Sequence, residues 1–158
     1  MNLLRQIKLD AQERALAALD WVAARRGMQL PPHLVTGLQG EDAAFFYLRR
    51  KGYTVVARRW SPGTEPGDID LIAWQGDLLC FIEVKTRTAH DLTPAEAAVD
   101  DHKRRMIRKL ARQYVRHLSM ESWPALRFDV ISVYLVPGRD KEFTHFEGAF
   151  SLHEFEDR

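Results

Sequence analysis

Three residues that could act together on a metal ion occur in two neighbouring apolar segments. Glu83 and Lys85 stand two positions apart in LLCFIEVKTR, residues 78–87. A strand alternates its side chains between two faces, so both would lie on one face of this segment. Asp70 belongs to DIDLIAW, residues 68–74, which also has the composition of a strand. The two segments therefore predict a pair of strands that carries two carboxylates and an ammonium group.

The short link Gln75-Gly76-Asp77 between the two segments predicts a hairpin. Pairing of the two strands would bring Asp70 and Glu83 within reach of one cation. In the first strand we expect Asp68 and Asp70 on one face, and Ile69 and Leu71 on the other. The second strand has a purely apolar second face, formed by Cys80, Ile82 and Val84. Charged groups are costly in such surroundings unless a partner compensates them.

The chemistry that these residue types suit is hydrolysis of a phosphodiester. Magnesium and manganese ions bind carboxylate oxygens together with water and phosphate. Such ions make a water molecule a better nucleophile and neutralise phosphoryl oxygens. Lys85 could orient the attacking water or neutralise the transition state. A plain surface salt bridge between Glu83 and Lys85 is the alternative.

Glu41 is a fourth candidate residue, on a helix predicted from Thr36 to Lys51 and ended by Gly52. Its spacing places it on the inward stripe formed by Ala44, Phe45 and Leu48. A carboxylate there could hold the metal directly or through water. An acid that stabilises the first turn of the helix is the alternative.

These motifs, taken in order, resemble the YraN family of bacterial proteins. The resemblance rests on Gly40-Glu41, on GDIDLI from Gly67, on FIEVKTR from Phe81, on Lys103, and on Arg127-Phe128-Asp129. It covers about residues 36–136. It implies a restriction-endonuclease-like PD-(D/E)XK fold, similar to that of archaeal Holliday-junction resolvases, with Asp70, Glu83 and Lys85 as the core of a metal-dependent nuclease site.

The resemblance also favours a site role for Glu41. The chain differs from the family pattern in three places. Asp68 stands where the family usually has Glu, the loop SPGTEPG is longer, and the helix before Thr36 is not part of the pattern.

Basic residues gather on one segment although the formal net charge of the chain is only +1. Lys103 stands at the end of an apolar helical stripe, where its ammonium group could reach a phosphate. The alternative is that its aliphatic part is buried and its ammonium group simply extends into solvent. A band of arginines on another face of this helix could follow the phosphate backbone of a nucleic acid. A solvated helix face is the alternative. The residues predicted to contact nucleic acid are Lys103, Arg105, Arg108, Arg112 and Arg87.

The order of elements predicts an α/β domain with a mixed central sheet flanked by helices. Residues 1–35 would form an amphipathic helix from Leu3 to about Arg26 with a linker at Pro31-Pro32, and residues 36–158 the nuclease-like domain. The buried stripe of the first helix would include Leu4, Ile7, Ala11, Ala15, Leu19 and Val22. This stripe could pack on its own domain or across a homodimer. Thr93 and Pro94 would begin the basic helix, and further strands would cover residues 53–60, 125–136 and 143–152.

Composition narrows the class of protein further. With 46% hydrophobic and 28% charged residues, the 158-residue chain is globular, and no apolar run suits a bilayer span. The single cysteine, Cys80, indicates a reducing compartment, so we expect a cytoplasmic protein without membrane contact. The predicted function is a Mg²⁺- or Mn²⁺-dependent nuclease that acts on DNA, including branched or structured forms. A non-catalytic nucleic-acid-binding protein with the same fold is the alternative, and a structural partner protein is a third hypothesis.

Overall fold

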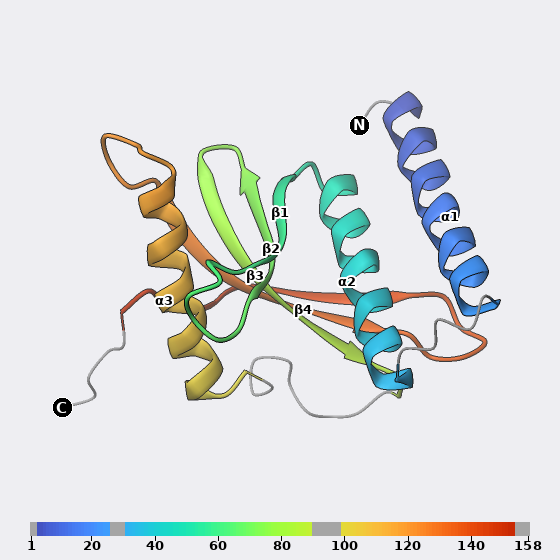
Figure 1. Ribbon diagram of the computed structural model, residues 1–158. Coiled ribbons are helices and arrows are strands. Elements are labelled where there is room, and N and C mark those ends of the chain that lie inside the picture. The colour runs from blue at the N-terminus through green and yellow to red at the C-terminus, as the bar shows by residue number, and fades with distance from the viewer. Residues whose placement is uncertain (1–2, 26–30, 90–98, 154–158) are drawn as a thin grey trace.

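A computed structural model of the protein describes residues 3–25, 31–89 and 99–153. Over these ranges the chain forms three helices and five strands (Figure 1). In chain order they are α1 (Leu3–Arg25), α2 (Pro32–Arg50), β1 (Thr54–Trp60), β2 (Ile69–Gln75), β3 (Leu78–Arg87), α3 (Asp101–His117), β4 (Ala125–Tyr134) and β5 (Glu142–Phe150). None of the helices in these ranges has the length and apolarity needed to cross a membrane.

The five strands form one mixed sheet in the order β1-β2-β3-β4-β5. β1, β2 and β3 are joined as antiparallel neighbours, β3 and β4 run parallel, and β5 is antiparallel to β4. Parallel neighbours require a long crossover, and α3 lies in the connection between β3 and β4. The predicted mixed sheet and the hairpin of the second and third strands are both confirmed.

Helices cover both faces of the sheet, with α2 on one side and α3 on the other (Figure 1). On the α3 side, Ile107 and Leu110 pack against Phe81, whereas on the α2 side Leu48 packs with Ile82. The predicted alternation along β3 is therefore confirmed. Cys80 lies in the α2-side core, where burial raises the pKa of its thiol to about 11, as expected of a small buried hydrophobe.

The expectation that Ile69 and Leu71 share a face is wrong. Ile69 belongs to the core on the α3 side, and Leu71 to the core on the α2 side. The pairing of β2 with β3 begins only at Leu71, opposite Ile82, while Ile69 pairs with Trp60 of β1. Regular alternation is thus interrupted at Asp70, where β2 separates from β3.

One predicted helix start differs from the structure, and another falls on residues that the structure does not describe. α2 begins at Pro32 rather than Thr36, because proline is favourable in the first turn of a helix and need not end one. Its end agrees with the prediction, since Gly52 follows with a φ of 92°. α3 begins at Asp101, and the Asp100 side chain caps it by accepting a hydrogen bond from the Lys103 amide. The predicted start at Thr93 and Pro94 lies outside the described residues.

α1 packs on α2 through a different face from the one predicted. Leu9 is buried, and Arg50 of α2 holds Asp10 and Glu13 at 2.7 Å and 2.5 Å. The large predicted stripe residues Leu4, Ile7 and Leu19 are exposed instead. Apolar spacing alone therefore chose the wrong face, and the face that packs on α2 carries Leu9 together with the acids that pair with Arg50. The helix packs on its own chain, and a homodimer stays a prediction.

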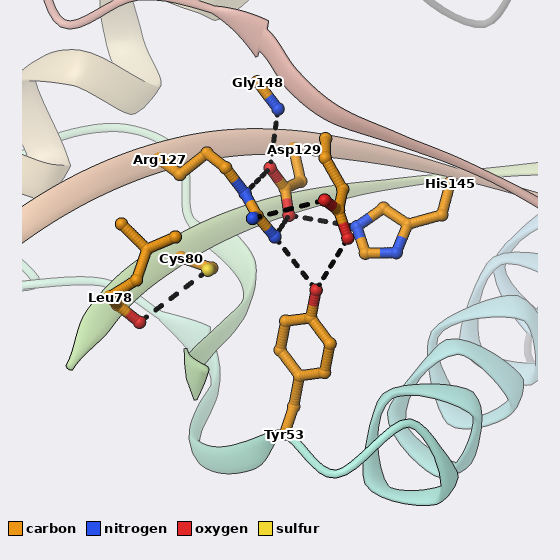
Figure 2. A network of polar contacts seen from close by, with 8 residues as sticks. Tyr53, Leu78, Cys80, Arg127, Asp129, His145 and Gly148 are labelled. Carbon is orange, nitrogen blue, oxygen red and sulfur yellow. Dashed lines mark hydrogen bonds and ion pairs between the residues drawn. The ribbon is translucent and has the colours of Figure 1, made fainter. Parts of the chain in front are cut away.

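A buried polar network ties β4 to β5 and to Tyr53 (Figure 2). The fully buried carboxylate of Asp129 accepts hydrogen bonds from Arg127 (2.8 Å), His145 (2.9 Å) and the Gly148 amide (2.9 Å). Arg127 also donates to the Tyr53 hydroxyl at 2.9 Å. Burial alone would raise the pKa of Asp129, but the hydrogen bonds from His145 and Arg127 outweigh it, and the pKa is lowered.

Candidate functional site

Asp70 and Glu83 meet where β2 separates from β3. The strand register pairs Leu71 with Ile82, so the next positions, Asp70 and Glu83, are cross-strand neighbours. Here the regular backbone pairing of β2 with β3 has ended, and the Val84 amide instead donates a hydrogen bond of 2.7 Å to Asp70 Oδ2. The side chain of Asp70 is thereby fixed directly against β3.

Both carboxylates are buried, with 9% of Asp70 and 4% of Glu83 exposed. Burial raises the pKa of Asp70 to about 8, and the charge of Glu83 acts in the same direction. The hydrogen bond from Val84 and the charge of Lys103 oppose this rise. Asp70 therefore favours either a bound proton or a nearby cation over a free charge.

Two lysines approach Glu83 from different elements. Lys85 Nζ on β3 lies 3.1 Å from Glu83 Oε1, and Lys103 Nζ on α3 lies 3.1 Å from Oε2. The second contact is an ion pair without hydrogen-bond geometry, since Oε2 is buried and lacks a hydrogen-bond partner. Burial alone would lower the pKa of Lys103, but the charges of Glu83 and Asp70 outweigh it and the pKa is raised.

Glu41 on α2 lies on the wall of the same hollow as the two carboxylates. The hollow has a volume of about 530 Å³ and is lined by Pro32, His33, Thr36, Gly37, Glu41, Asp70, Glu83, Val84, Thr86 and Thr88. Because α2 begins at Pro32, Glu41 lies in its middle, and the alternative of a first-turn acid is wrong. Arg59 holds Glu41 through two hydrogen bonds, from Nε to Oε2 (2.6 Å) and from Nη2 to Oε1 (2.9 Å).

α2 approaches β3 closely beside this hollow. Gly40 lies against Thr86, and a Cβ atom at Gly40 would stand only 1.8 Å from Thr86 Oγ1. Glycine therefore allows the helix to bring the adjacent Glu41 near the strand that carries Glu83.

The site does not contain a complete carboxylate cluster in this arrangement. Within residues 3–25, 31–89 and 99–153, no three acidic, histidine or cysteine side chains are grouped so that they could hold a metal ion. Asp70 and Glu83 are together, with Lys85 and Lys103 beside Glu83, whereas Glu41 is engaged by Arg59.

The α3 arginines predicted to contact nucleic acid lie elsewhere. Arg105 and Arg108 line a second hollow, of about 950 Å³, between α3 and strands β4 and β5. Arg108 is only 8% exposed and donates to the Ser151 carbonyl at 2.8 Å, and Arg112 donates to the Leu152 carbonyl at 3.1 Å. A fully solvated face is thus wrong for Arg108, because it anchors the chain after β5. Arg87 ends β3.

Arg59 is a residue near the site that the sequence did not single out. The charges of Asp68 and Asp70 act on its guanidinium in addition to its contacts with Glu41. The only signal in the sequence is the pair Arg58-Arg59 at the end of a strand, which usually reads as solvent-facing charge. Its φ of 47°, which aims the side chain, cannot be read from the sequence.

Comparisons with known proteins connect the chain to one family. The model of the uncharacterised protein family UPF0102 matches residues 40–133. A UPF0102 protein of Koribacter versatilis is 50% identical over 123 residues, which cover 77% of this chain and 83% of the relative. UPF0102 proteins of Porphyromonas gingivalis and Rhodococcus opacus are 41% and 40% identical, over 76% and 75% of this chain and 87% and 98% of their own lengths. The matched residues include Glu41, Arg59, Asp70, Glu83, Lys85 and Lys103.

Proposed function

The chain belongs to the uncharacterised protein family UPF0102, and we propose that it is a divalent-metal-dependent nuclease that hydrolyses phosphodiester bonds of DNA. UPF0102 and YraN designate one family, so the membership agrees with the resemblance seen in the motifs. The family name assigns no activity. The proposal therefore depends on the site.

The observation that carries the proposal is the buried pair of carboxylates, Asp70 and Glu83, at the opening of a hairpin. Two neighbouring buried acids cost the folded state free energy unless a cation compensates them. Lys85 and Lys103 compensate Glu83 in part, yet Glu83 Oε2 is buried without a hydrogen-bond partner, and the pKa of Asp70 stays raised by burial and by Glu83. These are hard oxygen donors, and they fit Mg²⁺ or Mn²⁺.

Each residue then has a distinct part in the proposed reaction. Asp70 and Glu83 would hold the cation, which when bound supplies positive charge against phosphoryl oxygens and acidifies a water molecule. Lys85 places an ammonium group beside this pair, from which it can donate a hydrogen bond to the attacking water or to a phosphoryl oxygen. Lys103 adds a second positive charge from α3. The hollow beside them leaves room for a phosphate group.

The fold proposed for this activity is the restriction-endonuclease-like PD-(D/E)XK core. The mixed sheet, the acids on a central hairpin and the helices on both faces are consistent with it. An archaeal resolvase-like preference for branched DNA is the finer proposal, which follows from the resemblance stated above.

A cleavage assay tests the proposal. The full-length protein is incubated with linear, flapped and four-way DNA in the presence of Mg²⁺, Mn²⁺ or a chelator. Asp70→Asn and Glu83→Gln keep the size of each side chain, and Asp77→Asn in the exposed β2–β3 turn is the matched control. We expect metal-dependent cleavage that falls at least about 100-fold in the two site variants and not in the control.

Equal cleavage by wild type and both site variants would mean that the activity belongs to a contaminating nuclease. DNA binding with no cleavage in either metal would favour the alternative, a nucleic-acid-binding protein that retains the fold.

A further inference from the structure

Arg59 occupies the strand position next to the candidate metal ligands. The register of β1 with β2 pairs Arg58 with Leu71 and Trp60 with Ile69, which places Arg59 opposite Asp70. The register of β2 with β3 in turn makes Glu83 the neighbour of Asp70. Arg59, Asp70 and Glu83 therefore form one row across three strands.

The backbone at Arg59 directs its side chain toward α2. In a regular strand, Arg58 and Arg59 would point to opposite faces of the sheet. Here both contact α2, since Arg58 pairs with Asp42 and Arg59 with Glu41. Trp60 then turns to the other face and packs against Tyr114 of α3. The left-handed backbone of Arg59, with a φ of 47°, breaks the alternation and is unusual for so large a side chain.

The contact between Arg59 and Glu41 occupies both oxygens of the carboxylate. Its two hydrogen bonds, of 2.6 Å and 2.9 Å, have the fork geometry that arginine forms with carboxylates. Glu41 lines the hollow with Asp70 and Glu83, yet in the described part of the chain no third acid is grouped with these two closely enough for a metal ion. Glu41 is thus near the site while its ligand atoms are engaged.

We propose that Arg59 is a positioning residue that competes with a divalent cation for Glu41. In the arrangement described here, the guanidinium holds Glu41 apart from Asp70 and Glu83. Participation of Glu41 in the metal site requires that this ion pair opens, so Arg59 sets the affinity of the site for the cation. This inference depends on the proposed metal-dependent function and adds a residue that controls it.

The exposure of Arg59 makes such an exchange feasible. Its side chain is 47% exposed, whereas that of Glu41 is 13% exposed. The guanidinium is already half exposed and can move fully into solvent, while the carboxylate of Glu41 remains at the wall of the hollow. Because the Glu41 carboxylate is largely buried and held at both oxygens, opening this pair has a cost that weakens cation binding, but the exposure of Arg59 keeps that cost from preventing binding.

Calorimetric titration of the full-length protein with Mn²⁺ tests the inference without measuring activity. The variant Arg59→Asn removes the guanidinium, and asparagine tolerates a left-handed backbone, so the strand is kept. Arg59→Gln is a second variant that preserves more of the side-chain length. Arg58→Gln is the matched control, because it removes the neighbouring arginine and its pair with the neighbouring acid, Asp42.

We expect both Arg59 variants to bind Mn²⁺ roughly tenfold more tightly than wild type, and Arg58→Gln to bind as wild type does. The decisive comparison repeats Arg59→Asn in a Glu41→Gln background. If Arg59 acts through Glu41, the gain in affinity falls to less than about twofold there.

An equal gain in both backgrounds overturns the inference, because it would reflect only the loss of a nearby positive charge. Equal Kd values for wild type and the Arg59 variants overturn the inference but leave the proposed metal site standing. Absence of Mn²⁺ binding in wild type and in every variant overturns both.

Discussion

Asp70 allows a direct test of the electrostatics of the site by a change of one atom type. Asp70→Asn removes the charge but keeps an oxygen that can accept the hydrogen bond from the Val84 amide. The pKa of Asp70 is raised from 3.8 to about 8, mainly by burial and then by the charge of Glu83. The variant should therefore be more stable than wild type wherever Asp70 would be forced to ionise.

The direction in which stability changes with pH follows from proton binding. Between about pH 4 and pH 8 the folded protein retains the Asp70 proton that the unfolded chain has released. The free energy of unfolding therefore falls as the pH rises through this window, by at most about 1.4 kcal/mol per pH unit. Over the whole window the decrease in the free energy of unfolding is at most about 5 kcal/mol. Movement of Lys85 and Lys103 toward the ionised pair reduces it.

Urea denaturation at a series of pH values from 5 to 8, in the presence of a chelator, measures this effect. We expect the stability advantage of Asp70→Asn over wild type to grow steadily with pH. Excess Mn²⁺ should reduce the advantage, since a cation that binds only the folded wild type stabilises it. Asp68→Asn, which removes a half-buried acid just before β2, should follow the pH dependence of wild type.

Parallel stability curves for wild type and Asp70→Asn would refute the reasoning. They would mean that Asp70 ionises equally easily in the folded and unfolded chain, and that the buried pair carries no electrostatic cost for a cation to relieve.

Two further predictions concern the stability of the fold, one through close packing and one through a buried ion pair. Gly40→Ala should lower the free energy of unfolding, measured by urea denaturation, by about 1–3 kcal/mol, because the new Cβ would meet Thr86 at 1.8 Å. Gly37→Ala on the same helix is the control. Its Cβ would meet nothing within 4 Å, so this change should be neutral or stabilising. Asp129→Ala should lower it by about 3–5 kcal/mol at neutral pH, since it leaves the guanidinium of Arg127 without its buried carboxylate. Because the pKa of Asp129 is lowered in the folded protein, the contribution of this acid is present above about pH 4 and is lost as the pH falls through the lower folded value.

The central hairpin could be predicted from the sequence because its signals are local. The run LLCFIEVKTR gives both ends of β3 correctly, and the Gly76 turn gives its pairing with β2. Alternation along β3 then follows from strand geometry alone. These local rules place Glu83 and Lys85 on one face before any tertiary contact is known.

Features that depend on distant contacts could not be predicted in the same way. The face that α1 buries carries Leu9 and an acid that pairs with Arg50, about 40 positions away in the chain, and the spacing of leucines does not reveal it. Arg108 reads as a solvated helix residue because its partner, the Ser151 carbonyl, lies beyond two strands in sequence. The direction of Arg59 depends on one backbone angle, for which an arginine gives no signal.

The position of β3 in the sheet has a consequence for how the site fluctuates. β4 pairs with β3 along its whole length, from Leu78 to Arg87, and β2 pairs with its first half. Amides of a strand flanked on both sides exchange with solvent only through rare, large openings. The Val84 amide is held by the Asp70 carboxylate. The hydrogen-exchange rate of the Val84 amide therefore reports local opening where β2 separates from β3. This opening is distinct from the cooperative unfolding of β3 together with β4.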